Sequence, residues 1–291
     1  MGTENLLAFR CLRSCGEPLS YERSWSKLLE EAAQKPGIIS DAYRVFHDYS
    51  TGNQLLALFQ CYERGLQVGP INTYPGWQKL GRHVRKGEKA ITLCMPVKRK
   101  RNQKASREPE DATTEGKHKR DPDDYFTIFV YKPNWFVLAQ TEGEPFRLPE
   151  LSQWDKYLAL ASLNITEIPF ECPDGNTLGF ARRREVAVSP LSPFPYKTLF
   201  HEVGHVELGH TAEADLYDGE HISRSLREAE AESVALLCGE SLGLGGADLA
   251  RGYIQHWLQG ETIPEKSAQK ILAAADRILK AGRLNVNQAE I

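Results

Sequence analysis

The sequence predicts an α+β protein with two domains, on three observations. Its 291 residues are enough to build two hydrophobic cores. Segments with helical spacing of apolar residues alternate with segments that read as strands, in both halves of the chain. Basic residues gather in the first half and the balancing acids in the second, although the net charge is only −3. We expect domains at residues 1–139 and 153–291, with a linker over residues 140–152.

The first half begins with a predicted helix over residues 40–59. Ser40 is a favoured N-cap residue, and residues 65–70 carry the glycines and proline that end a helix. A second helix is predicted from Pro75, a favoured first helical residue, through Val84. Both helices present apolar side chains on one side, as expected for helices that cover a core.

Two strands follow, over residues 90–97 and 125–131, where apolar and β-branched residues dominate. The segment between them, residues 98–124, is polar and charged and lacks apolar periodicity. We therefore expect a β-hairpin with a long loop.

The basic charge of the first half predicts a polyanionic partner. Nine basic residues between positions 82 and 104 face a single acid, Glu88: Arg82, Arg85, Lys86, Lys89, Lys98, Arg99, Lys100, Arg101 and Lys104. Cations neutralise phosphates and aromatic rings stack on unpaired bases, so the mixture suits single-stranded nucleic acid. The candidate contacts are Arg82, Arg85, Lys86 and Lys89 for phosphates, and Tyr49, Tyr74 and Trp77 for bases. Two alternatives stay open: Trp77 as a core residue, and Lys98–Lys104 as a solvated loop.

The second half opens with a strand predicted over residues 185–189, followed by three prolines that indicate a rigid connection. A strand beside a catalytic helix can hold an extended substrate by adding it to the edge of a sheet.

The segment His201–His210 contains the pattern His-Glu-x-x-His in a predicted helix. Residues four apart share a helix face, so His201 and His205 can occupy adjacent corners of a tetrahedral zinc ion. Glu202 stands beside them, where it can take a proton from a zinc-bound water. The pattern also arises by chance on solvated helices, but an apolar stripe and the mid-helix Gly204 indicate a buried helix that another element approaches closely.

A third ligand is predicted on the helix over residues 225–238. Glu228 and Glu232 lie four apart on one face beside an apolar stripe, where unpaired carboxylates would be costly. Glu228 completes a set of two histidines and one glutamate, and Glu232 could accept a proton from a ligand histidine. For Glu230 a solvated surface position is a viable alternative. His210 is out of register with three-histidine proteases, so we expect it at the helix end near the metal cleft, interacting with the final carbonyls.

Several classes are disfavoured by the sequence. No apolar stretch reaches about 18 residues and the N-terminus lacks a signal pattern, so we expect a cytoplasmic protein with no membrane contact. The six cysteines are scattered and predict thiols rather than a structural zinc site.

Two sets of motifs carry a resemblance to a known family. Tyr49–Leu56, Gly69–Tyr74 and Trp77–Ile91 resemble the N-terminal domain of ArdC-type antirestriction proteins, a module similar to part of TraC-type plasmid primases. Phe200–His205, Glu228–Glu232 and Gly252–Trp257 resemble the metalloprotease-like C-terminal domain of the same family. The sequence departs from that pattern at His256, where an asparagine is expected, and in the long basic insert at residues 98–124.

The resemblance implies a plasmid protein that protects incoming conjugative DNA. Its N-terminal domain would bind single-stranded DNA without sequence preference, and its C-terminal domain would have a zincin fold similar to SprT and Spartan proteases. His201, His205 and Glu228 would be the ligands, Glu202 the base and Glu232 the support of a histidine. Zinc is the expected metal, although manganese and cobalt suit similar ligands. DNA-bound proteins are the expected substrates; the alternative is a DNA-coating protein without peptidase turnover.

Overall fold

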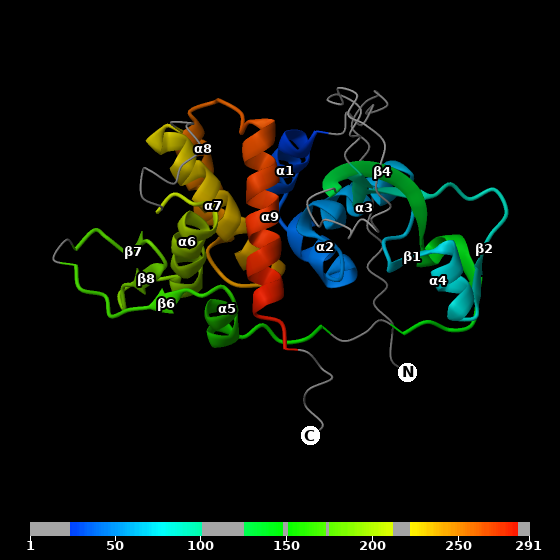
Figure 1. The fold of residues 1–291 in the computed structure, drawn as a ribbon, viewed down its shortest axis with the longest axis horizontal. Coiled ribbons are helices and arrows are strands. Elements are labelled where there is room, and N and C mark those ends of the chain that lie inside the picture. The colour runs from blue at the N-terminus through cyan, green and yellow to red at the C-terminus, as the bar shows by residue number, and fades with distance from the viewer. Residues whose placement is uncertain (1–23, 101–124, 148–150, 173–174, 212–221, 285–291) are drawn as a thin grey trace, which may run out of the picture.

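The computed structural model describes residues 24–100, 125–147, 151–172, 175–211 and 222–284. These residues form an α+β fold, as predicted. Figure 1 shows helix α9 in the middle, with α6, α7 and α8 on one side and α2, α3 and the first sheet on the other.

The predicted helix over residues 40–59 is two helices in the structure. They are α2 (Ile38–Phe46) and α3 (Thr51–Glu63), preceded by α1 (Trp25–Gln34). The break falls at residues 47–50 because Ser50 takes an extended backbone and serves as the N-cap of α3, a role that serine favours. Ser40 is not an N-cap: Gly37 holds that position in the left-handed region, and the Ser40 hydroxyl donates to its carbonyl.

The second predicted helix is shorter than expected. Strand β1 (Ile71–Thr73) leads into α4 (Tyr74–Lys79), and the chain then turns at Gly81, whose φ of 71° favours glycine. The residues that follow form strand β2 (Arg82–Val84) instead of continuing the helix. β2 pairs with β5 (Thr141–Gly143), so the first residues of the predicted linker are built into the N-terminal half.

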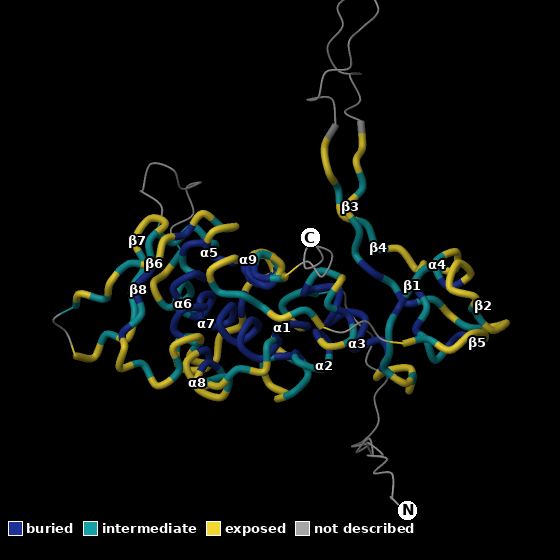
Figure 2. The backbone as a smooth tube through the Cα atoms, turned by 90° about the horizontal axis from the view of Figure 1, so that it is seen from below, coloured by how far each residue is buried: buried dark blue, intermediate teal, exposed yellow. Residues whose placement is uncertain are grey.

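The two predicted strands form a long antiparallel hairpin. They are β3 (Ile91–Lys100) and β4 (Tyr125–Val137), and the sheet order is β1-β4-β3. β4 runs six residues further than expected and continues into the short 3-10 helix η2 (Leu138–Gln140). Figure 2 shows the hairpin extending away from the body of the protein. Residues 101–124 of the predicted loop lie outside the described residues.

The C-terminal half combines helices with a second sheet. Its elements are α5 (Lys156–Ser162), β6 (Thr166–Glu167), β7 (Gly179–Arg182), β8 (Glu185–Val188), α6 (Pro195–Glu207), α7 (Arg224–Ser241), α8 (Ala247–Leu258) and α9 (Glu265–Ala281). The sheet order is β6-β8-β7. The predicted strand at residues 185–189 is therefore the central strand, already paired on both sides, and cannot offer an edge to a substrate. Among the described strands of this sheet, β7 is the edge that pairs antiparallel with β8.

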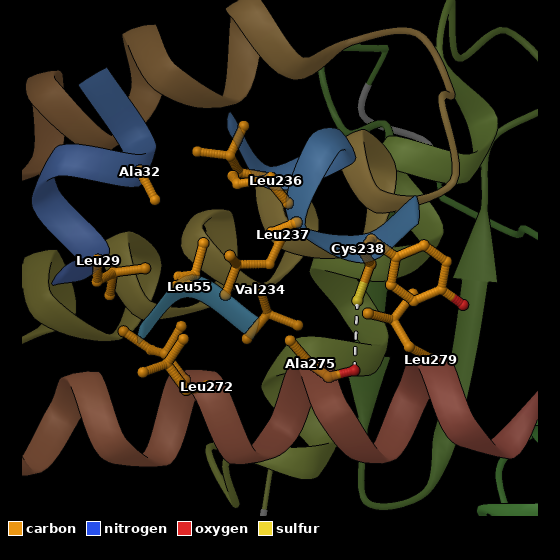
Figure 3. Close-up of a cluster of buried hydrophobic side chains, with 14 of the residues drawn as sticks. Leu29, Ala32, Leu55, Val234, Leu236, Leu237, Cys238, Leu272, Ala275 and Leu279 are labelled. Atoms are coloured by element: carbon orange, nitrogen blue, oxygen red, sulfur yellow. Dashed lines mark hydrogen bonds between the residues drawn. The ribbon is translucent and has the colours of Figure 1, made fainter. Parts of the chain in front are cut away.

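Helix α7 is the centre of the core. Every residue from Ala229 to Ser241 is buried, with α6, α8, α9 and α2 packed around it. Figure 3 shows leucines of α7 in one hydrophobic cluster with Leu29 of α1, Leu55 of α3 and Leu272 of α9. Helices from both predicted domains thus share one hydrophobic core, since each buries its apolar stripe against α7 or α9.

Across the described part of the chain, none of the helices combines the length and apolar character needed to cross a membrane.

Candidate metal centre

Helix α6 carries the His-Glu-x-x-His residues and packs tightly on α7. It begins at Pro195, a favoured first helical residue. Gly204 lies against α7, where an added Cβ would come within 3.3 Å of Val234. The close approach expected from this mid-helix glycine is confirmed, and it is what brings the ligand-bearing faces of the two helices together.

Three donor atoms converge between α6 and α7. The Nε2 atoms of His201 and His205 are 3.1 Å apart, and each lies 3.5 Å from Oε2 of Glu228. Donors around a tetrahedral zinc lie roughly 3.4 Å apart when each ligand distance is about 2.0–2.1 Å. The triangle formed by this protein is therefore close to the size that a divalent ion needs, and among the described residues these three form a group able to hold a metal.

Glu232 occupies a different position from Glu228. Its Oε1 lies 3.2 Å from Nδ1 of His201, the nitrogen that faces away from the other donors. The same oxygen accepts a hydrogen bond of 2.6 Å from Nζ of Lys197, one turn earlier on α6. Glu232 is buried and so is placed to orient His201, whereas Glu228 points at the donor triangle.

Electrostatics at the centre favour a cation. Burial by itself lowers the pKa of His201, but the carboxylates of Glu228 and Glu232 raise it to about 9. Contacts with the two histidines lower the pKa of Glu228 despite burial, so this group is a carboxylate. Two neighbouring carboxylates thus create a negative potential where the imidazoles meet.

Glu202 lines the cleft beside the donors. The cleft has a volume of about 270 Å³ and is also lined by His205, Glu228 and Ala181. Burial raises the pKa of Glu202 to about 7; the nearby His201 acts against this shift and Glu228 adds to it. Gly179 of β7 makes room for the side chain, because a Cβ there would lie 2.8 Å from Oε1 of Glu202.

His210 lines the metal cleft, as predicted, but its contacts and the position of Glu230 differ from the predictions. His210 Nδ1 lies 2.9 Å from Nδ1 of His205, and its Nε2 lies 2.8 Å from Oε2 of Glu230. The side chains of this pair are 3% and 1% exposed, so Glu230 is not a solvated surface residue and His210 does not serve the helix-end carbonyls. A proton on Nδ1 of His205 can be donated to His210, which in turn donates to the buried carboxylate. Sequence reasoning missed this support because Glu230 is off the face shared by Glu228 and Glu232.

The predicted phosphate contacts differ in their partners and in their exposure to solvent. Arg82 is used inside the protein: it donates to Thr141 Oγ1 at 2.9 Å and to backbone carbonyls of β5, and so holds β2 to β5. Arg85 donates to Glu88 and to the carbonyl of Ala139, with its side chain 44% exposed. Lys86 and Lys89 are exposed.

The three aromatic residues predicted to stack on bases also differ in exposure to solvent. Trp77 is 1% exposed and donates from Nε1 to the carbonyl of Phe136, so it is a core residue and presents no face to a base. Tyr49 is half-buried, and its hydroxyl donates to the carbonyl of Ile71. Tyr74, at 45% exposure, retains an accessible ring.

Comparisons with known proteins support this description. Residues 20–129 match the family model of the N-terminal domain of anti-restriction factor ArdC. Among solved structures, the metal-free crystal structure of antirestriction protein ArdC from the R388 plasmid has a TM-score of 0.50 at 21% sequence identity, covering 89% of this chain and 94% of that chain. The Mn(II)-bound structure of the same protein has a TM-score of 0.49 at 19% identity, covering 89% and 97%. No curated protein matches the sequence.

Fold and site together define an α+β protein in which three donors suited to a divalent metal face a cleft. Residues 20–129 thus match the N-terminal domain of anti-restriction factor ArdC, and the chain shares the fold of the antirestriction protein ArdC from the R388 plasmid.

Proposed function

We propose that this protein protects incoming plasmid DNA by binding single-stranded DNA and that its α6–α7 centre is a zinc metallopeptidase site. The observation that carries the enzymatic part is the triangle of His201 Nε2, His205 Nε2 and Glu228 Oε2, with sides of 3.1, 3.5 and 3.5 Å. Three protein ligands leave one tetrahedral position open, as in catalytic zinc sites.

Different residues have different roles in the proposed peptide hydrolysis. A bound zinc ion would lower the pKa of a water molecule to roughly 7. Glu202, in the same cleft, would act as the base that takes a proton from such a water and returns it to the departing amine. Glu232 and His210 orient the two ligand histidines from behind, and Lys197 holds Glu232 in place.

Strand β7 is the element proposed to hold the substrate. Ala181 of β7 lines the metal cleft, and Gly179 brings the strand against Glu202. Because β7 is an edge among the described strands, an extended peptide can pair with it and lie across the metal centre. Zinc is the proposed metal, since two imidazoles and one carboxylate form a common catalytic zinc set; manganese and cobalt fit the same donors.

The two proposed functions, DNA binding and catalysis, belong to the two predicted domains. We propose that residues 1–139 bind the DNA, residues 153–291 carry the catalytic centre, and residues 140–152 join them. The described cysteines, Cys61, Cys94, Cys172 and Cys238, are free thiols, which suits the proposed action in the cytoplasm.

The test is cleavage of a basic DNA-binding protein by the full-length, zinc-loaded chain, with and without single-stranded DNA. We expect cleavage to rise with DNA, because holding both proteins on one strand raises their local concentration. Glu202→Gln keeps the three ligands and should abolish cleavage without changing metal content or DNA affinity. If the fully metallated protein shows no cleavage in either condition yet still protects DNA in conjugation, the peptidase role is wrong and a DNA-coating function replaces it.

A further inference from the structure

A second concave surface lies between the β3–β4 hairpin and helix α9. It is an open cavity of about 700 Å³ lined by Trp25, Phe129 and the α9 residues Lys266, Lys270 and Arg277, among others. Residues of α1, α3, β3, β4 and α9 line it, so elements from both halves of the chain build it. We call it the α9 groove. The proposed peptidase mechanism makes no use of it.

One wall of the α9 groove is aromatic. Phe129 is 69% exposed, an unusual exposure for a ring on a strand. The strand register places Phe129 on the same face as Tyr131, which stacks on Trp25 with ring centroids 6.3 Å apart and planes 22° from parallel. An exposed ring next to a stacked pair offers a flat apolar surface to a planar ligand.

The other wall is positively charged. Lys266, Lys270 and Arg277 line the groove from the exposed side of α9, at helical spacing. Their positions extend over about 17 Å at a rise of roughly 1.5 Å per residue. Arg277 pairs with Glu207 of α6 while its side chain stays 48% exposed.

Two acids of α9 lie near this wall, and each has partners within the protein. Glu265 accepts hydrogen bonds from the backbone amides of Trp25 and Ser26 at the start of α1. Asp276 accepts from the backbone amide of Thr51 and pairs with Lys280 at 2.9 Å. Asp276 lines the groove, so among the charged side chains that line it three cations, Lys266, Lys270 and Arg277, face one acid.

We propose that the α9 groove is where single-stranded nucleic acid binds, with a base stacked on Phe129 and phosphates along α9. This inference rests on the proposed DNA binding by residues 1–139 and extends it, because Phe129 belongs to that half whereas the phosphate contacts on α9 come from the C-terminal half. The combination of an exposed aromatic ring with a row of cations is what unpaired nucleic acid requires: the ring takes any base, and the cations neutralise the backbone. An acidic peptide would match the cations but would not need the aromatic wall.

The location has a consequence for the metal centre. The groove borders α9, and α9 contacts α6 through the pair of Arg277 with Glu207, the last residue of α6. A nucleic-acid strand in the groove is therefore held by both halves of the chain, beside the catalytic half rather than at the β2–β5 strand pair. This arrangement would present proteins on the same strand to the catalytic half.

The experiment is binding of the full-length chain to a fluorescent oligothymidine of about 20 nucleotides, measured by anisotropy at several salt concentrations. Phe129→Ala should weaken binding roughly fivefold or more, the loss expected when one base loses its aromatic partner. Phe126→Ala is the matched control, because Phe126 is 42% exposed but lies on the opposite face of the same strand. It should leave affinity unchanged.

The charged wall is tested in the same assay. Lys266→Gln with Lys270→Gln should reduce the slope of log affinity against log salt by about 1.4, two contacts at roughly 0.7 each. Lys35→Gln with Arg44→Gln removes two exposed cations of α1 and α2 away from the groove and should leave the slope intact. Metal content measured on each variant shows that the catalytic half is still folded.

Three outcomes are distinguishable. If the wild-type chain does not bind the oligonucleotide, both the proposed DNA binding and this location are wrong. If the wild-type chain binds and the groove variants bind equally well, only the location is wrong, and Lys86→Gln with Lys89→Gln then tests the other basic surface. If an acidic peptide displaces the oligonucleotide and Phe129→Ala has no effect on either, the groove is a peptide site and the proposal fails.

Discussion

Replacing His210 and Glu230 together by leucine should weaken zinc binding by about 10- to 100-fold without unfolding the protein. His205 loses the acceptor that lies 2.9 Å from its Nδ1, so its ring orientation and tautomer are no longer fixed. Removal of such a supporting partner typically costs that factor in metal affinity, or about 1.4–2.7 kcal/mol. The double change also removes the buried pair as a unit, which is often neutral or stabilising.

The single variants separate ligand support from folding. His210→Leu alone leaves the carboxylate of Glu230, 1% exposed, without its histidine partner. Breaking a buried pair from one side costs about 3–5 kcal/mol, so the single variant should unfold at a much lower temperature than the double variant. The single and the double variant should both bind zinc weakly, because each lacks the His210 acceptor for Nδ1 of His205.

The assay is competition with a chromophoric chelator, together with thermal unfolding in the presence of EDTA. Lys156→Gln with Glu167→Gln is the control, since it removes a partly exposed ion pair of 2.8 Å away from the centre and should change neither quantity. Wild-type zinc affinity in the His210–Glu230 double leucine variant would refute the argument that His210 positions His205.

Two other predictions follow from the same structure. Glu228→Ala should cost more zinc affinity than Glu232→Ala in a chelator competition, because Glu228 faces both imidazole Nε2 atoms and Glu232 faces only Nδ1 of His201; the reverse ranking would overturn the assignment. Burial, helped by Arg283, lowers the pKa of His47 below its usual 6.5 although Asp48 opposes the shift, so the native state keeps this ring neutral while the unfolded chain takes up a proton. The free energy of unfolding should therefore fall between pH 7 and pH 5, and less so in His47→Gln; parallel losses in denaturant titrations at the two pH values would contradict this.

The predicted elements differ from the observed ones where a helical pattern in the sequence runs across a position at which the chain reverses direction. Val84 fits the apolar side of a helix from Pro75, yet Gly81 turns the chain and β2 pairs with β5, some 60 residues further along. Strand pairing over such a separation has no signal in a single sequence. Trp77 shows the same limit, because an aromatic residue among cations suits both a base contact and a core, and only its 1% exposure decides between them.

The metal-ligand motif is what the sequence by itself determined. The spacing of His201 and His205 sets a shared helix face, because an α-helix repeats every 3.6 residues, and the same rule applies to Glu228 and Glu232. Such constraints are local and need no knowledge of the fold. Tertiary structure alone decided which nitrogen each glutamate faces, that His210 and Glu230 form a buried pair behind His205, and that α9 and the β3–β4 hairpin enclose a charged aromatic groove. Those arrangements depend on how α6, α7 and α9 pack. Packing brings together side chains that are far apart in the sequence, and no periodic pattern in the sequence indicates that they will meet.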